Sequence, residues 1–155
     1  IFSKSNQNKL ENYLNKNGFT EDEGVWTKEE KVTENETTTN TTSTYDLDIN
    51  KYVKEIQSNG ANYQEQYRFK YNGNNDIIVN YSYSGTEDNK NCILTQEATY
   101  NYKNKDFQCN VKYNKSDCSL HCDDIKKHSE IFGKEIEEVM DNAKVNELFL
   151  IKDKD

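Results

Sequence analysis

The sequence lacks proline altogether and contains a single arginine, Arg68, among its 155 residues. Its lysines are scattered, and the formal net charge is -8. Clustered positive charge is what binds nucleic acid and anionic membrane surfaces. No apolar run reaches the roughly 18 residues that a membrane-spanning helix needs. These absences argue against nucleic acid as a partner and against a spanning helix as a membrane anchor.

Motifs that carry chemistry are also scarce. The chain has no glycine-rich phosphate loop and no nucleophile elbow around a serine. His121 and Cys122 are adjacent, and consecutive helical side chains diverge by about 100°, so these two do not form a nucleophile and base pair. The abundant carboxylates form no pair that stands out from chance. The sequence therefore predicts no enzymatic activity and no cofactor, and it places His121 and His128 as exposed helix residues.

Apolar residues make up only 32% of the chain, a proportion that leans toward disorder, but 11 tyrosines act in the opposite direction. A tyrosine ring buries a large area while its hydroxyl stays at the rim of the core. A chain of this length fits one domain. We therefore predict that residues 1–155 form a single domain with a core built largely from tyrosine.

Aromatic, apolar and cysteine residues alternate with polar ones from Tyr63 to Tyr113. Strand side chains point alternately to opposite faces, so this pattern predicts an antiparallel meander with one buried and one solvated face. The positions assigned to the buried face are Tyr67, Phe69, Tyr71, Ile77, Val79, Tyr81, Tyr83, Cys92, Leu94, Ala98, Tyr100, Tyr102, Phe107, Cys109, Val111 and Tyr113.

Two turns set the expected register of this meander, because a slip by one residue exposes every buried side chain. A loop over 72–76 and a turn at 104–105 join the strands. Extending the second register brings Cys92 opposite Asp117. The expected pairs are Tyr71 with Ile77, Phe69 with Val79, Tyr67 with Tyr81, Tyr102 with Phe107, Tyr100 with Cys109 and Ala98 with Val111.

Helical spacing appears at the two ends of the chain. Leu10 and Leu14 indicate a first helix over 5–17, which Gly18 ends. A longer stripe after Ser119 predicts a second helix that covers the apolar face of the sheet. That stripe consists of Ile125, Phe132, Ile136, Val139, Met140 and Ala143.

Three further segments carry weaker patterns. The threonine-rich stretch over 33–44 is read either as the exposed tip of a long hairpin or as a mobile loop, and the hairpin is favoured because threonine prefers strands. Tyr45, Leu47 and Ile49 alternate as in a strand, and 145–151 is either an edge strand or an extension of the last helix. The predicted class is α+β, with an antiparallel meander of about five to six strands and with both helices packed on one face.

Four cysteines admit two disulfides, a metal site or free thiols. Cys109, Cys118, His121 and Cys122 offer zinc-type ligands, but their spacing is not that of a zinc finger or ribbon. Cys92 opposite Asp117 lies beside Cys118, and Cys109 faces the first turn of the covering helix. We therefore favour the disulfides Cys92 with Cys118 and Cys109 with Cys122, which indicate an oxidising, extracytoplasmic compartment.

The solvated face of the meander carries amide, hydroxyl and charged side chains. Such a face suits a glycan or peptide partner, although it is equally what a plain solvated sheet presents. The candidate binding residues are Arg68, Asn80, Thr95, Glu97, Thr99, Asn101, Gln108 and Asn110.

The segment Tyr100-Asn101-Tyr102-Lys103 through Cys109, followed by Cys118, Cys122 and an acidic helix, resembles small uncharacterised extracytoplasmic lipoproteins of AT-rich Gram-positive bacteria. This resemblance implies a lipid anchor on an upstream cysteine, then a tether and this domain. It implies no activity.

The function expected from the sequence is a secreted or surface-tethered, non-enzymatic binding or interaction domain. Its partner is then an unknown protein or glycan at the cell surface, and any membrane contact runs through the upstream lipid anchor. Two alternatives stay open: a structural, envelope-associated protein, and an inhibitor or accessory module that acts on another protein through its open sheet face.

Overall fold

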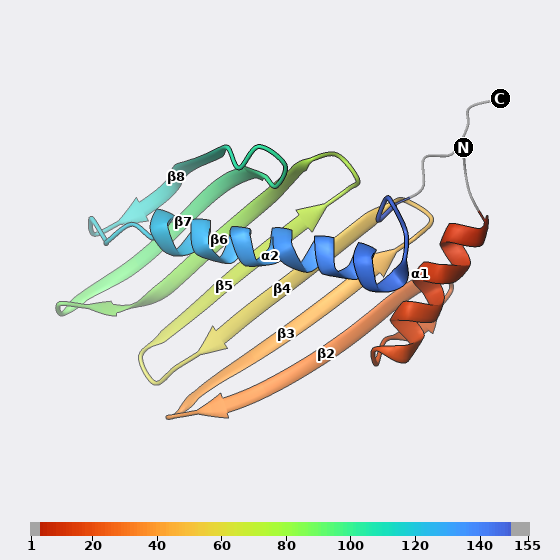
Figure 1. Cartoon of the computed structure of the whole chain (residues 1–155). Coiled ribbons are helices and arrows are strands. Elements are labelled where there is room, and N and C mark those ends of the chain that lie inside the picture. The colour runs from red at the N-terminus through yellow and green to blue at the C-terminus, as the bar shows by residue number, and fades with distance from the viewer. Residues whose placement is uncertain (1–3, 150–155) are drawn as a thin grey trace.

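The computed structural model describes residues 4–149, which form an α+β fold. Its single antiparallel sheet has eight strands, more than the five to six predicted, and the order of the strands in space follows their order along the chain. Two helices lie on the same side of this sheet (Figure 1). The elements are α1 (Lys4–Lys16), β1 (Thr20–Asp22), β2 (Val25–Glu34), β3 (Thr37–Asp46), β4 (Lys51–Asn59), β5 (Tyr63–Tyr71), β6 (Asp76–Glu87), β7 (Lys90–Asn101), β8 (Phe107–Lys115) and α2 (Cys122–Ala143).

The threonine-rich stretch belongs to the hairpin β2–β3, as favoured, and supplies the end of β2, the turn and most of β3. Its turn consists of Asn35 and Glu36, whose φ angles are 49° and 65°. Two positive φ angles are typical of the hairpin turn whose twist matches that of the strands. The strand expected to continue through Leu47 and Ile49 was wrong, because β3 ends at Asp46 and residues 47–50 turn into β4.

The register of β5 and β6 is confirmed, with Tyr71 opposite Ile77. The register of the last hairpin was wrong: Tyr100, and not Tyr102, lies opposite Phe107. The cause is a loop over 102–106 that is longer than the two-residue turn expected. The side-chain Oδ1 of Asn101 accepts hydrogen bonds from two backbone N–H groups of this loop, both at 3.0 Å.

A β-bulge between Thr95 and Gln96 shifts the register of β7 and β8 again. Gln96 lies opposite Val111, but Thr95 lies opposite Tyr113, so β8 carries one extra residue at this point. Residues that lie opposite each other share a face, and Tyr113 therefore projects from the outer face with Thr95. The sequence pattern had placed Tyr113 on the buried face. Val111 was also expected to be buried, but it lies on an edge strand and is 43% exposed.

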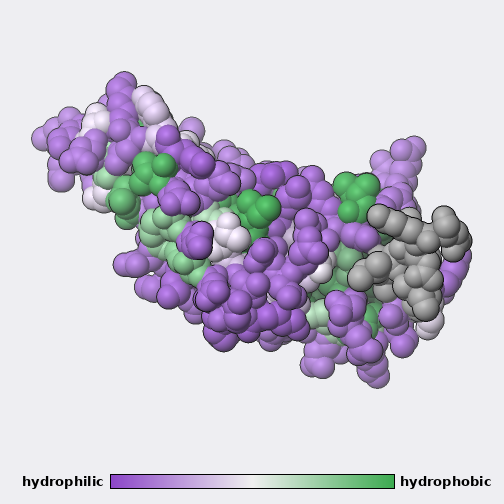
Figure 2. Space-filling model, turned by 90° about the horizontal axis from the view of Figure 1, so that it is seen from above, coloured by the Kyte–Doolittle hydropathy of each residue, from purple (hydrophilic) through white to green (hydrophobic). Residues whose placement is uncertain are grey.

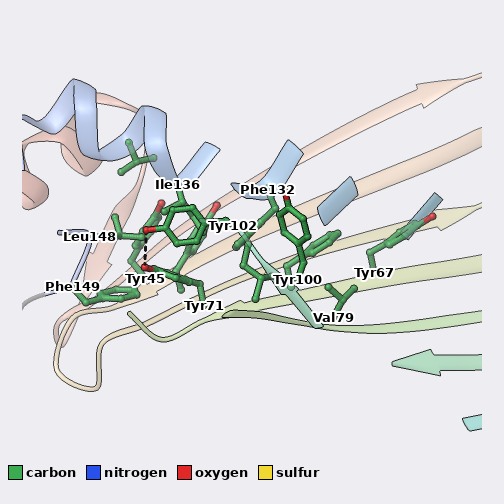
Figure 3. Close-up of a cluster of buried hydrophobic side chains, with 14 of the residues drawn as sticks. Tyr45, Tyr67, Tyr71, Val79, Tyr100, Tyr102, Phe132, Ile136, Leu148 and Phe149 are labelled. Carbon is green, nitrogen blue, oxygen red and sulfur yellow. Dashed lines mark hydrogen bonds between the residues drawn. The ribbon is translucent and has the colours of Figure 1, made fainter. Parts of the chain in front are cut away.

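The core lies between α2 and the inner face of the sheet, where aromatic rings pack in a row (Figure 3). The ring centroid of Phe132 lies 5.0 Å from that of Tyr52 and 5.2 Å from that of Phe69. The ring of Tyr45 stacks on Tyr52 at 3.9 Å. Leu10, Leu14, Ile136, Val79 and Leu94 are buried as predicted. Four other residues expected to be buried are only partly so, namely Tyr83, Phe107, Cys109 and Met140.

The end of the described chain continues this core without regular structure. Lys144 adopts the left-handed conformation, with φ of 60°, and ends α2. Residues 145–149 form neither the edge strand nor the helix extension expected, yet Leu148 and Phe149 are buried. The remaining two positions of the predicted 145–151 segment lie outside the described residues.

Seen from above, the surface of the molecule is largely hydrophilic, with hydrophobic residues in separate patches (Figure 2).

Two disulfides join Cys92 to Cys118 and Cys109 to Cys122, the two pairs that the sequence favours. Their Cα atoms lie 5.8 and 5.9 Å apart, within the usual range for disulfides. The first bond does not arise from the predicted pairing with Asp117, because the ladder ends with Ile93 opposite Lys115. All four sulfurs are bonded, so none is left as a thiolate ligand for the zinc site considered above.

Mapping of the unreduced protein should recover these two pairs as linked peptides. The intact mass should be lower than that of the reduced protein by two hydrogens for each bridge, because each disulfide replaces two thiol hydrogens. Mass spectrometry before and after reduction measures this difference. A linked peptide pair containing Cys92 and Cys109 would contradict the strand placement described here.

Candidate functional site

The two faces of the sheet have different surroundings. Both helices cover the inner face, and no helix in residues 4–149 packs on the outer one (Figure 1). All eight candidate binding residues lie on the outer face. Some alternate along their strand with buried, inward-facing residues, and the others pair across strands with one of these outward-facing residues. The structure aligns four of them in one row across β5 to β8: Arg68, Asn80, Glu97 and Asn110.

Short side chains on β6 make a depression in this face. Asn80, Ser82 and Ser84 alternate along the strand, and β5 beside them carries Gln64, Gln66 and Arg68 at the opposing positions. We call the floor formed by Asn80, Ser82 and Ser84, with its walls, the β6 trough. It comprises one hollow of about 290 Å³ and a second of about 160 Å³, which share Gln66, Ser82 and Thr95.

The row through Ser82 shows how the trough is shaped. Gln66, Ser82, Thr95 and Tyr113 lie opposite one another on four successive strands. The two middle side chains are short and the two outer ones are long, so the row has raised sides and a low centre. The bulge in β8 supplies the far side, because it turns Tyr113 outward, where the residue is 53% exposed.

Charged residues at the trough occur as ion pairs. The Arg68 Nε lies 3.1 Å from Glu55 Oε1, and the Lys112 Nζ lies 3.4 Å from Glu97 Oε2. Two positive and two negative charges thus cancel locally. Exposed pairs of this kind stabilise a fold by about 1 kcal/mol or less, so their main effect is to hold donors and acceptors in place.

Three candidate residues lie away from the trough. Thr99 and Gln108 lie opposite each other beside Ile78, beyond the end of the trough. The side chain of Asn101 closes the 102–106 loop and donates to Asp76 Oδ1 at 3.1 Å, which is a structural role. Several residues that line the two hollows were not singled out as binding candidates from the sequence, among them Gln64, Gln66, Ser82, Ser84, Ile93 and Lys112. Tyr113 lines neither hollow but lies opposite Thr95, which lines both.

The inner face holds one buried amide that the sequence pattern passed over. Gln96 is 1% exposed, and its Nε2 lies 3.0 Å from Cys122 Sγ and 3.4 Å from Cys109 Sγ. Its Oε1 accepts the backbone N–H of His121 at 2.8 Å. The amide therefore satisfies a free N–H at the start of α2 and positions that helix against the disulfide.

Both histidines contact aromatic rings, so the expectation that they are exposed was wrong. The ring centroid of His128 lies 4.3 Å from that of Tyr67, and the ring of His121 packs 5.1 Å from Tyr81. Tyr81 donates from its hydroxyl to Glu65 Oε2 at 2.5 Å, and burial raises the pKa of this tyrosine. These contacts join the start of α2 to β5 and β6, and we assign them to the fold.

Among residues 4–149, no group of three or more histidine, cysteine or acidic side chains is arranged to hold a metal ion. The helices of this range are all too short or too polar to cross a membrane. The outer face carries the two hollows described above. Comparison with protein-family models, with curated proteins and with solved structures found no match to the chain.

Proposed function

We propose that the chain is an extracytoplasmic, non-enzymatic binding domain that contacts its partner through the β6 trough. The observation that supports this most is the run of short side chains at Asn80, Ser82 and Ser84 between longer ones, on a face that neither helix covers. A sheet face that only needs to be solvated requires no such hollow. Binding sites are typically concave, with a few placed polar groups.

The groups around the trough suit recognition better than covalent chemistry. Hydroxyls and amides of Ser82, Thr95 and Gln66 both donate and accept hydrogen bonds, and they stand on strands rather than on loops. Strand positions hold side chains in a defined order at fixed spacing. This arrangement favours a binding module over a hydrolase.

The two disulfides support an oxidising compartment for this domain. The resemblance of the last hairpin and helix to small lipoproteins supports a tether at the cell surface. The domain would then present the trough to a glycan or a protein outside the membrane.

Filling the trough should abolish binding without disturbing the fold. Ser82→Arg places a long side chain on the floor of the hollow, where it occludes the space that a partner would occupy. On arrays of glycans and peptides, the wild-type protein should bind defined spots, and Ser82→Arg should lose at least about tenfold in affinity, which equals about 1.4 kcal/mol.

Thr27→Arg is the matched control, because Thr27 lies on the same outer face, opposite Thr44, but on β2, three strands away from β5. It should bind as the wild type does. Circular dichroism and disulfide mapping establish that both variants are folded. Equal binding by all three proteins would contradict a role for the trough.

A further inference from the structure

We infer that the β6 trough binds an uncharged oligosaccharide that lies along β6. This inference rests on the proposed function and specifies the class of its ligand. The trough extends over the rows of Asn80, Ser82 and Ser84, and a strand rises roughly 3.3 Å per residue, so its floor is about 13 Å long. Such a length accommodates more than one sugar ring.

Charge favours a neutral ligand. Arg68 is paired with Glu55 and Lys112 with Glu97, so an acidic ligand would have to displace a glutamate from each cation. The whole chain carries a net charge of -8, which repels anions at a distance. An uncharged ligand meets neither barrier, and it still finds the charged groups as oriented hydrogen-bond donors and acceptors.

Hydrogen-bonding capacity favours a sugar over an extended peptide. A peptide gains most of its affinity for a sheet by pairing its main chain with an open strand edge. β6 has no open edge along the trough, because β5 and β7 pair with it on its two sides. The trough instead offers hydroxyls and amides, which both donate and accept and so match the hydroxyl groups of a sugar.

Tyr113 supplies an apolar surface beside these polar groups. It lies opposite Thr95, which contributes to both hollows, and it is 53% exposed although tyrosine rings generally gain by burial. A sugar ring has a C–H face as well as its hydroxyls, and an exposed aromatic ring is a suitable surface for that face. The bulge that turns Tyr113 outward thereby places this ring beside Thr95, at the border of the trough.

Isothermal titration calorimetry tests this inference with neutral hexasaccharides of β-linked glucose, α-linked glucose, β-linked mannose and N-acetylglucosamine. The comparison probes are an acidic hexasaccharide of galacturonic acid and an uncharged serine- and asparagine-rich peptide. At least one neutral hexasaccharide should bind the full chain more tightly than either comparison probe does. Tyr113→Ala should weaken this binding about tenfold, and Ser82→Arg should abolish it, whereas Thr27→Arg should leave it unchanged.

The outcomes separate the two proposals. Binding of the peptide or of the acidic sugar in preference to every neutral sugar, with loss in Ser82→Arg, would overturn the glycan inference and leave the trough as a binding site. Absence of binding to all the neutral hexasaccharides would likewise overturn the glycan inference. Sugar binding that survives Ser82→Arg would overturn both proposals, since the ligand would then sit elsewhere.

Discussion

Above about pH 10, the ordinary pKa of tyrosine, the protein is expected to unfold in a steep, cooperative step. Burial raises the pKa values of seven tyrosines above 10, and it raises those of five inner-face tyrosines most strongly. In the unfolded chain the same hydroxyls ionise near pH 10, so above this pH the unfolded state binds fewer protons than the folded one, and stability falls. The five residues are Tyr45, Tyr52, Tyr67, Tyr71 and Tyr81.

The size of this effect follows from proton linkage. Each such tyrosine keeps its full contribution below pH 10, and above it the free energy of unfolding falls by about 1.4 kcal/mol per pH unit and per tyrosine. Five tyrosines together give about 7 kcal/mol per pH unit. That loss is comparable to the whole stability of an ordinary domain, which is roughly 5 to 15 kcal/mol.

Far-ultraviolet circular dichroism and tyrosinate absorbance, followed against pH, should change together. Tyr45→Phe keeps the stacked ring but removes one ionising hydroxyl, so the loss of stability per pH unit should be smaller by about 1.4 kcal/mol. Tyr113→Phe is the control, and because Tyr113 is exposed, it should leave the transition unchanged. Gradual ionisation with a native circular dichroism signal would contradict a tyrosine core that excludes water.

Phe132→Ala should lower the free energy of unfolding by about 3 to 5 kcal/mol. The ring of Phe132 is 2% exposed and packs between Tyr52 and Phe69, on the stripe of α2 that faces the sheet. Its removal leaves a cavity that stiff aromatic neighbours cannot easily fill. Urea denaturation of the oxidised protein measures the change.

Ile131→Ala provides the comparison for this variant, because Ile131 is the preceding residue of the same helix and is 60% exposed. Its substitution should change the free energy of unfolding by no more than about 0.5 kcal/mol. Similar losses for both variants would show that the helix is oriented differently on the sheet.

The parts of the fold that sequence reasoning predicted are those in which the alternation of side chains is uninterrupted. Tyr67, Phe69 and Tyr71 match the inward positions of β6 across a short loop, so one register satisfies all of them. The strands β2 and β3 were harder to delimit, because a run of threonines fits either face of a sheet. Their pairing is fixed by a turn with positive φ angles at Asn35 and Glu36. Glutamate seldom adopts a positive φ, so the sequence does not predict this turn.

The last hairpin departs from its predicted register for reasons that are local in the chain but depend on geometry. Asn101 closes a loop with its side chain, and asparagine is too common here for one copy to be recognised as a loop residue. The bulge then changes which face Tyr113 occupies. Disulfide pairing was less sensitive, because Cys109 keeps its inward direction under either register.

The candidate site was predictable only in part. Alternation placed Arg68, Asn80 and Thr95 on the solvated face, and all three line the larger hollow. The hollow itself depends on the relative sizes of side chains on neighbouring strands, which become known only with the register. Gln96 shows a different difficulty. Because it is polar, it interrupted the apolar alternation of the inward positions, yet it is buried and both its Nε2 and its Oε1 form hydrogen bonds.

The meander order of the strands also affects how the protein is made. Every strand pairs with its neighbours in the chain, so the sheet can assemble hairpin by hairpin as synthesis proceeds from the N-terminus. The helix that covers the aromatic face is the last regular element within residues 4–149, and both disulfides need residues at or just before its start. Until α2 has been synthesised, the row of tyrosine rings is exposed to water. A ribosome that stalled before Cys122 would therefore carry a nascent chain with an exposed aromatic surface, to which chaperones and other chains would bind.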